Sequence, residues 1–459
     1  MIASLINVFK IPELRRKILF TVLVLAVYRL GMYLPIPGTS PAFLHSFAAS
    51  QQGQMETSTE GGLQEYLKFI AKITGGSFQP FLFALGIMPY ISASIILQLL
   101  TQALPALEKL AKEGESGRRK INEYTRYLTV LLCVIQGAFI YSSDWRGDEI
   151  SHTIYFLVCI MAMTAGTVFL MWLGELVDEY GIGNGISLII MAGIVDRLPS
   201  VVQYLTQNAT MEFLSFQNTE GKIGIETIIL VTAMFVAVVL AVVLITQAQR
   251  RIPIQQAKHT RGRRTYGGQR QYLPLRVNQA GVIPVIFASS LLYLPMYLFQ
   301  YIANATADTW AGAFTREVAE AFGYGNPIHQ LIYVALIFIF CYFWTAIQFQ
   351  PREMANNLRD WGTFIPGMRP GRRTADYLER VMNRITYVGA AFLSVIAIVP
   401  IVVSSMLQVP MLMAGFLGGT SLLIMVSVAL DVVQRIESHL IMRHYEGFLA
   451  EGRVRGRRG

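Results

Sequence analysis

Charged residues are scarce in this sequence of 459 residues. They make up 15% of the chain, whereas a soluble protein carries about 25%. Hydrophobic residues reach 53%. So apolar a chain must bury its side chains, which excludes a disordered protein. A single soluble core is not expected either, and lipid is the medium that this composition indicates.

Cysteine and catalytic motifs are also lacking. Cys133, Cys159 and Cys341 each lie within an apolar run, so they cannot build a disulfide scaffold and are interpreted as packed or lipid-facing small side chains. The sequence has no phosphate-binding G-x-x-x-x-G-K-[ST], no HExxH and no nucleophile elbow. We therefore expect no enzyme, no metal site and no cofactor.

Long apolar runs are abundant. A helix needs roughly 20 mostly apolar residues to cross a bilayer, and ten segments meet this condition. They are approximately 17–35, 79–102, 124–142, 153–173, 184–204, 225–247, 280–302, 328–350, 385–405 and 412–433. The sequence predicts an all-α membrane protein with ten transmembrane helices.

The distribution of Lys and Arg predicts the orientation. Ten spans put both termini on one side, and the opposite side carries only Lys68, Lys72, Arg146, Lys222 and Arg316 of the 38 basic residues. Basic residues in short loops mark the cytoplasmic side. We expect a multi-pass protein of the inner or plasma membrane with both termini in the cytoplasm.

The spans divide into two groups of five, at residues 1–215 and 216–459. An odd number of spans in each half is compatible with an inverted repeat, in which a functional path lies at the interface of the halves. The two halves show no visible sequence similarity. Two inverted, pseudo-symmetric five-helix halves are therefore a compatible architecture for this chain.

Residues 61–74, GGLQEYLKFIAKIT, are too short and too charged to span a membrane. Their partial apolar stripe consists of Leu63, Leu67, Ile70 and Ile73, with Phe69 beside it. One interpretation is an interfacial amphipathic helix. The other is a re-entrant segment folded into a cavity, which is allowed where protein or water surrounds it.

Isoleucine occurs near Gly or Pro breaks in four of the predicted spans. These residues are Ile87, Ile91, Ile186, Ile190, Ile286 and Ile424. Isoleucine in a membrane helix ordinarily faces lipid or the protein core. Around a central path, however, such side chains would form a constriction that stays dry and blocks ions.

Few charges lie within the spans: Arg29, Asp196, Arg197 and Asp431. A secondary transporter of small solutes would need convergent polar groups at the midplane, and an intramembrane enzyme would need a nucleophile with a base or paired Asp residues. Neither pattern is visible. Arg29 is expected to reach the outer interface, and Asp196 with Arg197 to form a local polar cluster.

Two long basic loops are predicted on the cytoplasmic side. Residues 248–279 contain eight Lys and Arg and no Asp or Glu, and their stretch QRQYLPLRV (269–277) predicts a projecting hairpin. Residues 351–384 form the second loop. Such loops attract anionic lipid, RNA or an acidic protein, although basic loops can also serve topology alone. Two of them beside each other indicate docking of a large partner, and phosphate contacts to rRNA would fit.

Several strings resemble the bacterial SecY family. They are PIPG (35–38), FALGIMPYISASIILQLL (83–100), EGESGRRKINEYTRY (113–127), MWLGE (171–175), GIGNGIS (181–187), AGVIPVIFASS (280–290), QPRE (350–353), RPG (369–371) and GGTSLLI (418–424). The resemblance runs through nearly the whole chain. It departs at outer loops 45–60 and 143–152, and at Gln350, where the family usually has Asn.

The resemblance implies a protein-conducting channel made of two five-helix halves hinged between spans five and six. Residues 61–74 would be a re-entrant plug helix, and the six isoleucines match the family's pore ring within their motifs. The lateral gate would lie between span two and spans seven and eight, near Ser92, Ser289 and Ser290.

The resemblance also implies the partners and the work of the channel. The two basic loops would dock the SecA motor or the ribosome through residues such as Arg250, Arg251, Arg263, Arg264, Arg369 and Arg372, with Arg369 the best candidate for a required contact. SecE and SecG would be fellow subunits, and SecDF, YidC and anionic lipids further partners. Preproteins with a signal sequence would be the substrate, driven by SecA or by translation.

Overall fold

The structure, a computed structural model, describes most of the chain. The described residues are 11–40, 80–141, 151–196, 198–199, 202–203, 206, 209–210, 223–256, 259–261, 264–266, 270–288, 291–292, 299, 302–303, 310–322, 326–406 and 419–451. They form two compact units. The first comprises Met1–Leu198 with Val428–Gly459, and the second comprises Pro199–Ser427. The predicted division at residue 215 concerns an inverted repeat, and it stays a prediction.

The first unit is helical. Its helices are α2 (Pro12–Gly31), α5 (Met88–Ala103), α6 (Pro105–Lys112), α7 (Glu115–Ile140), α8 (His152–Tyr180) and α9 (Gly185–Val195), followed much later by most of α18 (Gly419–Glu451). Helix α8 packs against α2, α7 and α9, and α5 packs against α7. Buried Tyr155, Cys159 and Met163 of α8 form a core with Cys133 of α7.

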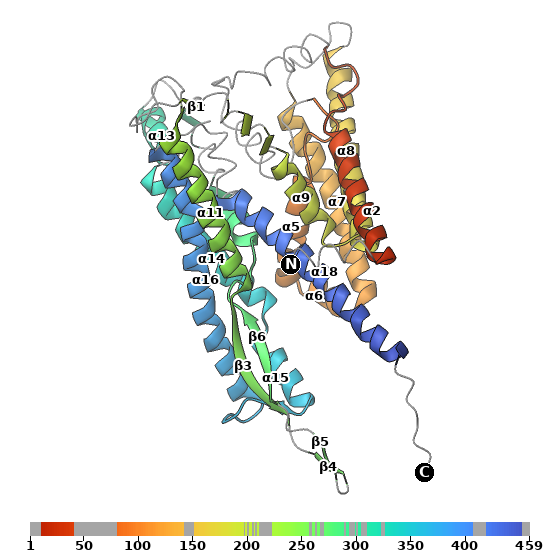
Figure 1. Ribbon diagram of the computed structural model, residues 1–459. Coiled ribbons are helices and arrows are strands. Elements are labelled where there is room, and N and C mark those ends of the chain that lie inside the picture. The colour runs from red at the N-terminus through yellow and green to blue at the C-terminus, as the bar shows by residue number, and fades with distance from the viewer. Residues whose placement is uncertain are drawn as a thin grey trace. The chain divides into compact units, whose positions relative to one another are not determined.

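The second unit combines a helical bundle with small sheets. Its elements are β1 (Ala209–Thr210), β2 (Ile223–Gly224), α11 (Ile225–Gln247), β3 (Gln249–Gln256), β4 (His259–Arg261), β5 (Arg264–Tyr266), β6 (Arg270–Arg276), α13 (Trp310–Ala321), α14 (Pro327–Gln348), α15 (Pro351–Asp360), β7 (Thr363–Phe364) and α16 (Arg372–Met406). Figure 1 shows α11, α14 and α16 side by side, and α16 contacts both of the other helices. Their shared core includes Val242, Ile337 and Leu393, each fully buried.

Local sequence explains many helix starts. Pro12, Pro105, Pro327 and Pro351 each stand at the first position of a helix, where a proline lacks only a donor that the helix would leave unpaired and already has a helical φ. Helix α9 begins differently, because the Asn184 side chain accepts a hydrogen bond from the backbone N–H of Ser187 at 3.0 Å. This N-cap satisfies one of the orphan donors of the first turn.

Membrane-spanning character is present in both units. Within the described residues, four helices are long and apolar enough to cross a bilayer: His152–Tyr180, Glu226–Gln247, Pro327–Asp360 and Arg372–Pro400. The count rises to five if Met88–Thr101 and Pro105–Lys112, which are bent by 99°, form one span. The shorter helix α9 is apolar as well.

Helices occur at nearly all of the predicted spans, but several bounds differ. The span predicted from residue 79 becomes helical only at Met88, because residues 80–87 form a bridge and turns. The span predicted for 184–204 begins with α9, which ends at Val195, and residues 198–199 and 202–203 are helical as well. Conversely α7, α8, α16 and α18 run well beyond the apolar runs that predicted them. The GIGNG stretch (181–185) forms a tight turn between α8 and α9, with Gly183 at φ +103°.

Candidate functional site

A two-stranded β-ribbon, formed by β3 and β6, follows directly after α11. Strand β3 pairs antiparallel with β6 over seven residues, which places Arg250 opposite Leu275 and Arg251 opposite Pro274. Both arginines are exposed, whereas Ile252 and Ile254 further along β3 are buried. Exposed and buried residues alternate from Arg251 to Ile254, as the two-residue period of a strand predicts. Arg250 lies on the same face as Ile252 and Ile254, before the buried stretch begins. The projecting hairpin predicted from residues 269–277 is confirmed.

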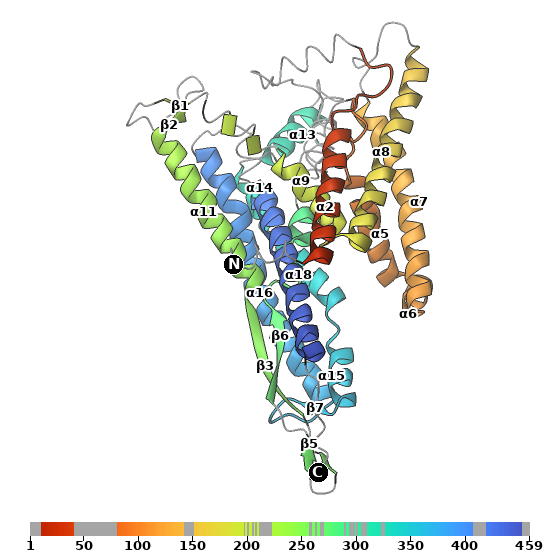
Figure 2. The same cartoon turned by 45° about the vertical axis from the view of Figure 1, so that its right-hand side comes forward.

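A third strand connects the two basic loops. In β7, Phe364 pairs with Gln255 and Thr363 pairs with Gln256 of β3, so that the sheet has the order β6-β3-β7. Loops 248–279 and 351–384 therefore share one sheet, and the prediction that they lie beside each other is confirmed. Figure 2 shows β7 and α15 next to the ribbon. We call this assembly of β3, β6, β7, α15 and the first turns of α16 the platform.

The platform has an apolar core of its own. Side chains from β3, β6, α15 and α16 converge there with two residues of the connecting chain: Ile252, Ile254, Leu275, Phe349, Leu358, Ile365, Leu378, Val381, Met382 and Ile385. Each fully buried aliphatic side chain contributes about 1.5–3 kcal/mol. Because this cluster is continuous with the end of α14 and the beginning of α16, it holds the loops as a rigid surface on the second unit.

Arg369 lies exposed on a tightly defined turn of the platform. Gly367 has φ +85° and Gly371 has φ +112°, conformations that only glycine adopts without strain. The hydroxyl of Thr374, a buried residue, donates to the carbonyl oxygen of Arg369 at 3.0 Å. Arg372, the first residue of α16, lies three positions further along the chain and is also exposed. The turn fixes the backbone that carries these two guanidinium groups.

Arg264, a further predicted docking residue, lies in the small hairpin of β4 and β5. Strands β4 and β5 pair with Arg261 opposite Arg264, so the register brings basic residues together there. Arg263 lies outside the described residues. Four of the predicted docking arginines (Arg250, Arg251, Arg369 and Arg372) thus belong to one continuous platform, and Arg264 to the hairpin at its end.

The predicted pore-ring residues of the first unit lie at the beginnings of two helices. Ile87 caps α5 and is fully buried, and the N–H of Ile91 donates to its carbonyl oxygen at 3.2 Å. Ile186 and Ile190 lie in the first two turns of α9; Ile190 is buried, and Ile186 lies against Gly174 of α8. The structure therefore places each pair near a helix start.

The other predicted site residues have different positions. In the second unit Ile286 is half-buried on a short helical stretch, and Ile424 is buried near the start of α18. Ser92 is half-buried on α5. The plug residues Leu63, Leu67, Ile70 and Ile73 and the gate residues Ser289 and Ser290 lie outside the described residues. The ring, plug and gate stay predictions.

Charges within the predicted spans are paired where the structure describes them. Arg29 forms an ion pair with Asp196 and lies over the ring of Tyr33, 4.8 Å from its centroid. Asp431 accepts from Arg435 at 2.9 Å. Sequence reasoning grouped Asp196 with Arg197, because neighbours in sequence are visible and a partner 167 residues away is not.

A further ion pair joins α7 and α8. The guanidinium of Arg126 donates to both carboxylate oxygens of Glu175, at 3.2 and 2.7 Å. This two-bond geometry is the strong form of an ion pair. Asp178, one turn beyond Glu175, accepts from the backbone N–H of Gly185 at 2.8 Å. The Asp178 contact fixes the start of α9, which carries Ile186 and Ile190, against α8. Sequence reasoning missed them.

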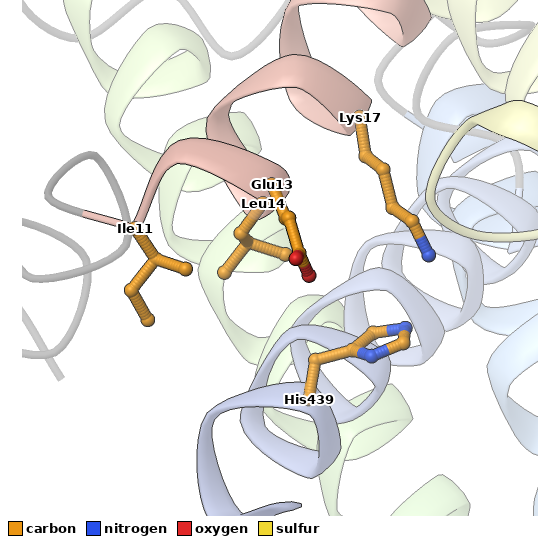
Figure 3. A pocket seen from close by; sticks show the side chains of 5 residues that line it. All are labelled: Ile11, Glu13, Leu14, Lys17 and His439. Atoms are coloured by element: carbon orange, nitrogen blue, oxygen red, sulfur yellow. The ribbon is translucent and has the colours of Figure 1, made fainter. Parts of the chain in front are cut away.

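A small cleft lies between the first turns of α2 and the later part of α18. Figure 3 shows Lys17 and Glu13 pointing from α2 toward His439, with Ile11 and Leu14 beside them. These five residues lie at or beyond the ends of the predicted spans 17–35 and 412–433. A solute carrier requires its site near the bilayer midplane, so this cleft gives no support to the transporter alternative. The described residues contain no group of three or more His, Cys, Asp or Glu suited to a metal ion.

Of the two interpretations of the three cysteines, packed or lipid-facing, the structure supports packed side chains. Cys133, Cys159 and Cys341 are free thiols, and all three are buried in helices. They act as small apolar side chains in the two cores.

Comparisons with known proteins agree with this architecture. The SecY family model matches residues 82–433. "Protein translocase subunit SecY" of Thermotoga maritima is 42% identical, covering 98% of this chain and 99% of the relative. The protein of the same name from Streptomyces coelicolor is 43% identical, covering 98% of this chain and 100% of the relative. The one from Aquifex aeolicus is 40% identical, covering 96% of this chain and 98% of the relative.

Solved structures show the fold. One described as a protein conducting channel has a TM-score of 0.59 at 20% identity, covering 95% of this chain and 96% of the other. Sec61 in the canine ribosome-channel complex has a TM-score of 0.57 at 19% identity, covering 95% and 96%. The predicted fold class is thus confirmed: this is a multi-pass helical membrane protein with the fold of protein-conducting channels. More narrowly, the chain belongs to the SecY family.

Proposed function

We propose that this chain is the pore-forming subunit of a protein translocon. It conducts unfolded, signal-bearing polypeptides across the membrane and releases hydrophobic segments sideways into lipid. The observation that carries the proposal is the platform, in which two basic loops share one sheet over a dedicated apolar core. A chain that passed only small solutes would not need so rigid a surface for a large partner.

The platform supports docking of an external motor. The SecA ATPase or the translating ribosome supplies the free energy, and Arg250, Arg251, Arg369 and Arg372 of the platform contact it. Phosphate or carboxylate groups of such a partner suit guanidinium donors because the pairing can be bidentate. One structural neighbour is a ribosome-bound Sec61, which supports the ribosome as a partner of this chain.

The conduction path uses the six isoleucines. Ile87, Ile91, Ile186, Ile190, Ile286 and Ile424 form an aliphatic constriction that yields around side chains of many shapes and excludes ions when closed. Residues 61–74 plug the closed channel. A solved structure that this chain resembles, with a TM-score of 0.58 at 19% identity, is described as showing that the plug domain of SecY stabilises the closed state.

A lateral gate near Ser92, Ser289 and Ser290 releases hydrophobic segments. Such segments partition into lipid because they remove apolar area from water, worth roughly 25 cal/mol per Å². Polar segments stay in the channel, since an unpaired backbone group in hydrocarbon costs several kcal/mol. The channel itself needs no catalytic residue for this sorting.

The assembly lies in the inner or plasma membrane with both chain ends in the cytoplasm. The uneven distribution of Lys and Arg supports this orientation, and it puts the platform on the cytoplasmic side. SecE and SecG are the fellow subunits. SecDF, YidC and anionic lipids are further partners.

Reconstitution tests the proposal directly. The purified chain is assembled with SecE, SecG and SecA in vesicles and given ATP and a signal-bearing precursor, and protease protection of the precursor is measured. Protection that requires both ATP and the signal is expected. A precursor without its signal is the matched control. Absence of protection, from a complex shown to be folded and assembled, would overturn the proposal.

A further inference from the structure

Residues 80–87 adopt an irregular backbone within a predicted membrane span. This stretch runs antiparallel to the chain that leaves α2. The N–H of Ile36 donates to the carbonyl oxygen of Pro80 at 2.7 Å, and the N–H of Leu82 donates to that of Leu34 at 2.9 Å. Irregular backbone at membrane depth is tolerated only where protein satisfies its polar groups. Here the hydrogen bonds with residues 34–36, which follow α2, satisfy polar groups of residues 80–82.

The buried side chain of Phe83 holds residues 80–87 against α2 and α8. Its side chain is 2% exposed and lies between two rings, Tyr28 of α2 at 6.3 Å and Phe169 of α8 at 6.1 Å, both nearly parallel to it. We call the space between the rings of Tyr28 and Phe169 the slot. Gly31 leaves room for the Phe83 ring in this slot, because a Cβ at position 31 would lie 1.9 Å from that ring. Any other residue at position 31 would push the ring out.

Helix α8 holds the other end of the stretch. A Cβ at Gly166 would lie 2.0 Å from the carbonyl oxygen of Leu82, so the two backbones touch. The hydroxyl of Thr167 donates to the carbonyl oxygen of Gly86 at 3.2 Å, and Gly86 turns the chain at φ +58°. The next residue, Ile87, is the N-cap of α5.

This arrangement fixes where α5 begins. Only three residues lie between Phe83 and Ile87, and the N–H of Gly86 donates to the carbonyl oxygen of Phe83 at 2.9 Å. The N–H of Ile91 donates to the carbonyl oxygen of Ile87 at 3.2 Å. The Phe83 slot therefore sets the position of both isoleucines.

We propose that residues 80–87 are a positioning anchor for the channel seal, with Phe83 as the residue that holds the anchor in its slot. The anchor keeps Ile87 and Ile91 in place. This inference rests on the proposed function. It predicts that loosening the slot unseals the closed channel without touching the isoleucines themselves.

The test compares Phe83→Ala with a core truncation elsewhere. Leu393→Ala, at a fully buried position of the second unit, is the matched control for lost stability. Complexes are reconstituted in planar bilayers, and the ion conductance without precursor is measured beside the translocation of a precursor that lacks its signal. We expect Phe83→Ala to raise the resting conductance about tenfold, the shift produced when a minor open state becomes appreciably populated, and to admit the signal-less precursor.

Two further variants keep the test decisive if Phe83→Ala does not fold. Gly31→Ala fills the slot, and Thr167→Val removes the hydroxyl that holds Gly86; both should leak. Phe83→Tyr keeps the ring between its two neighbours and should remain closer to wild type than Phe83→Ala. A purely structural role would instead lower the melting temperature in all of these variants, as in Leu393→Ala, and leave the conductance low.

Wild type and a variant lacking residues 61–74 are measured in the same preparation. If wild type translocates, the deletion leaks, and the folded slot variants stay as tight as Leu393→Ala, the anchor inference is wrong while the proposed function stands. If wild type fails to translocate, the proposed function fails and the inference fails with it.

Discussion

Gly185, the first residue of α9, lies directly against Gly174 of α8. A Cβ added at Gly185 would be 2.0 Å from the carbonyl oxygen of Gly174, which leaves no room for any larger residue. The contact brings Ile186 onto α8, since a Cβ at Gly174 would be 3.2 Å from its Cγ1. Close backbone approach at glycine is a usual packing mode of membrane helices.

Gly185→Ala should displace α9 and destabilise the first unit by about 1–3 kcal/mol, the usual cost of overpacking. Thermal unfolding in detergent measures this. Gly137→Ala is the matched control: its Cβ would meet Ile160 at an ordinary 3.8 Å, and alanine favours an α-helix by about 1 kcal/mol over glycine. Equal losses in the two variants would contradict the close contact.

The Arg29–Asp196 pair should show energetic coupling between α2 and α9. Their side chains are 43% and 28% exposed, so a modest value of about 0.2–1 kcal/mol is expected. A double-mutant cycle with Arg29→Ala, Asp196→Ala and the double variant isolates that value from the melting data. Strictly additive losses would mean that the two charges do not interact in solution.

Arg369→Glu should slow motor-driven translocation while the protein still inserts and folds. A charge-assisted contact contributes about 1.5–3 kcal/mol, so a loss of tenfold or more in rate is expected, since about 1.4 kcal/mol corresponds to a factor of ten. Arg380→Glu, a second exposed residue of the same loop, makes the same charge change and is the control. Undiminished rates for Arg369→Glu would remove this residue from the docking surface.

Ile190→Ser should weaken the ion seal. Serine in the constriction would let water wet it, and a dry aliphatic ring is what excludes ions. Ile189→Ser changes the adjacent buried position of α9, which faces another direction, and should cost stability without leakage. Conductance across a planar bilayer separates the two, and a tight Ile190→Ser channel would argue against the ring.

Sequence reasoning found the membrane segments but misjudged their ends. Hydropathy detects the part of a helix that lies in lipid, so α7 was expected from residue 124, although it begins at Glu115. The added turns carry Arg118, Arg119 and Lys120. Helix α16 likewise begins at Arg372, and its first turns bury Leu378 and Val381 in the platform core. Charged, amphipathic turns stay helical outside the bilayer, where hydropathy gives no signal.

The opposite error occurred at residues 80–87. These residues are as apolar as a spanning helix, yet their backbone pairs with the chain leaving α2 and Phe83 enters a slot between two helices. Tertiary contacts between distant segments decide this conformation, and composition carries no trace of them. The hairpin of β3 and β6 was predictable because alternation along a strand is a local signal, whereas its pairing with β7 depends on residues a hundred positions away.

Helix α18 has a consequence for the order in which the protein matures during synthesis. Val432, Ile436 and Leu440 of α18 pack against Leu14 of α2 and Ile182. Domains generally fold from the N-terminus as they emerge, but here α2 receives one of its packing partners from α18, about four hundred residues later. The first unit therefore stays incomplete until α18 has been synthesised, and a premature stop before Val432 would also weaken the packing of a helix made much earlier.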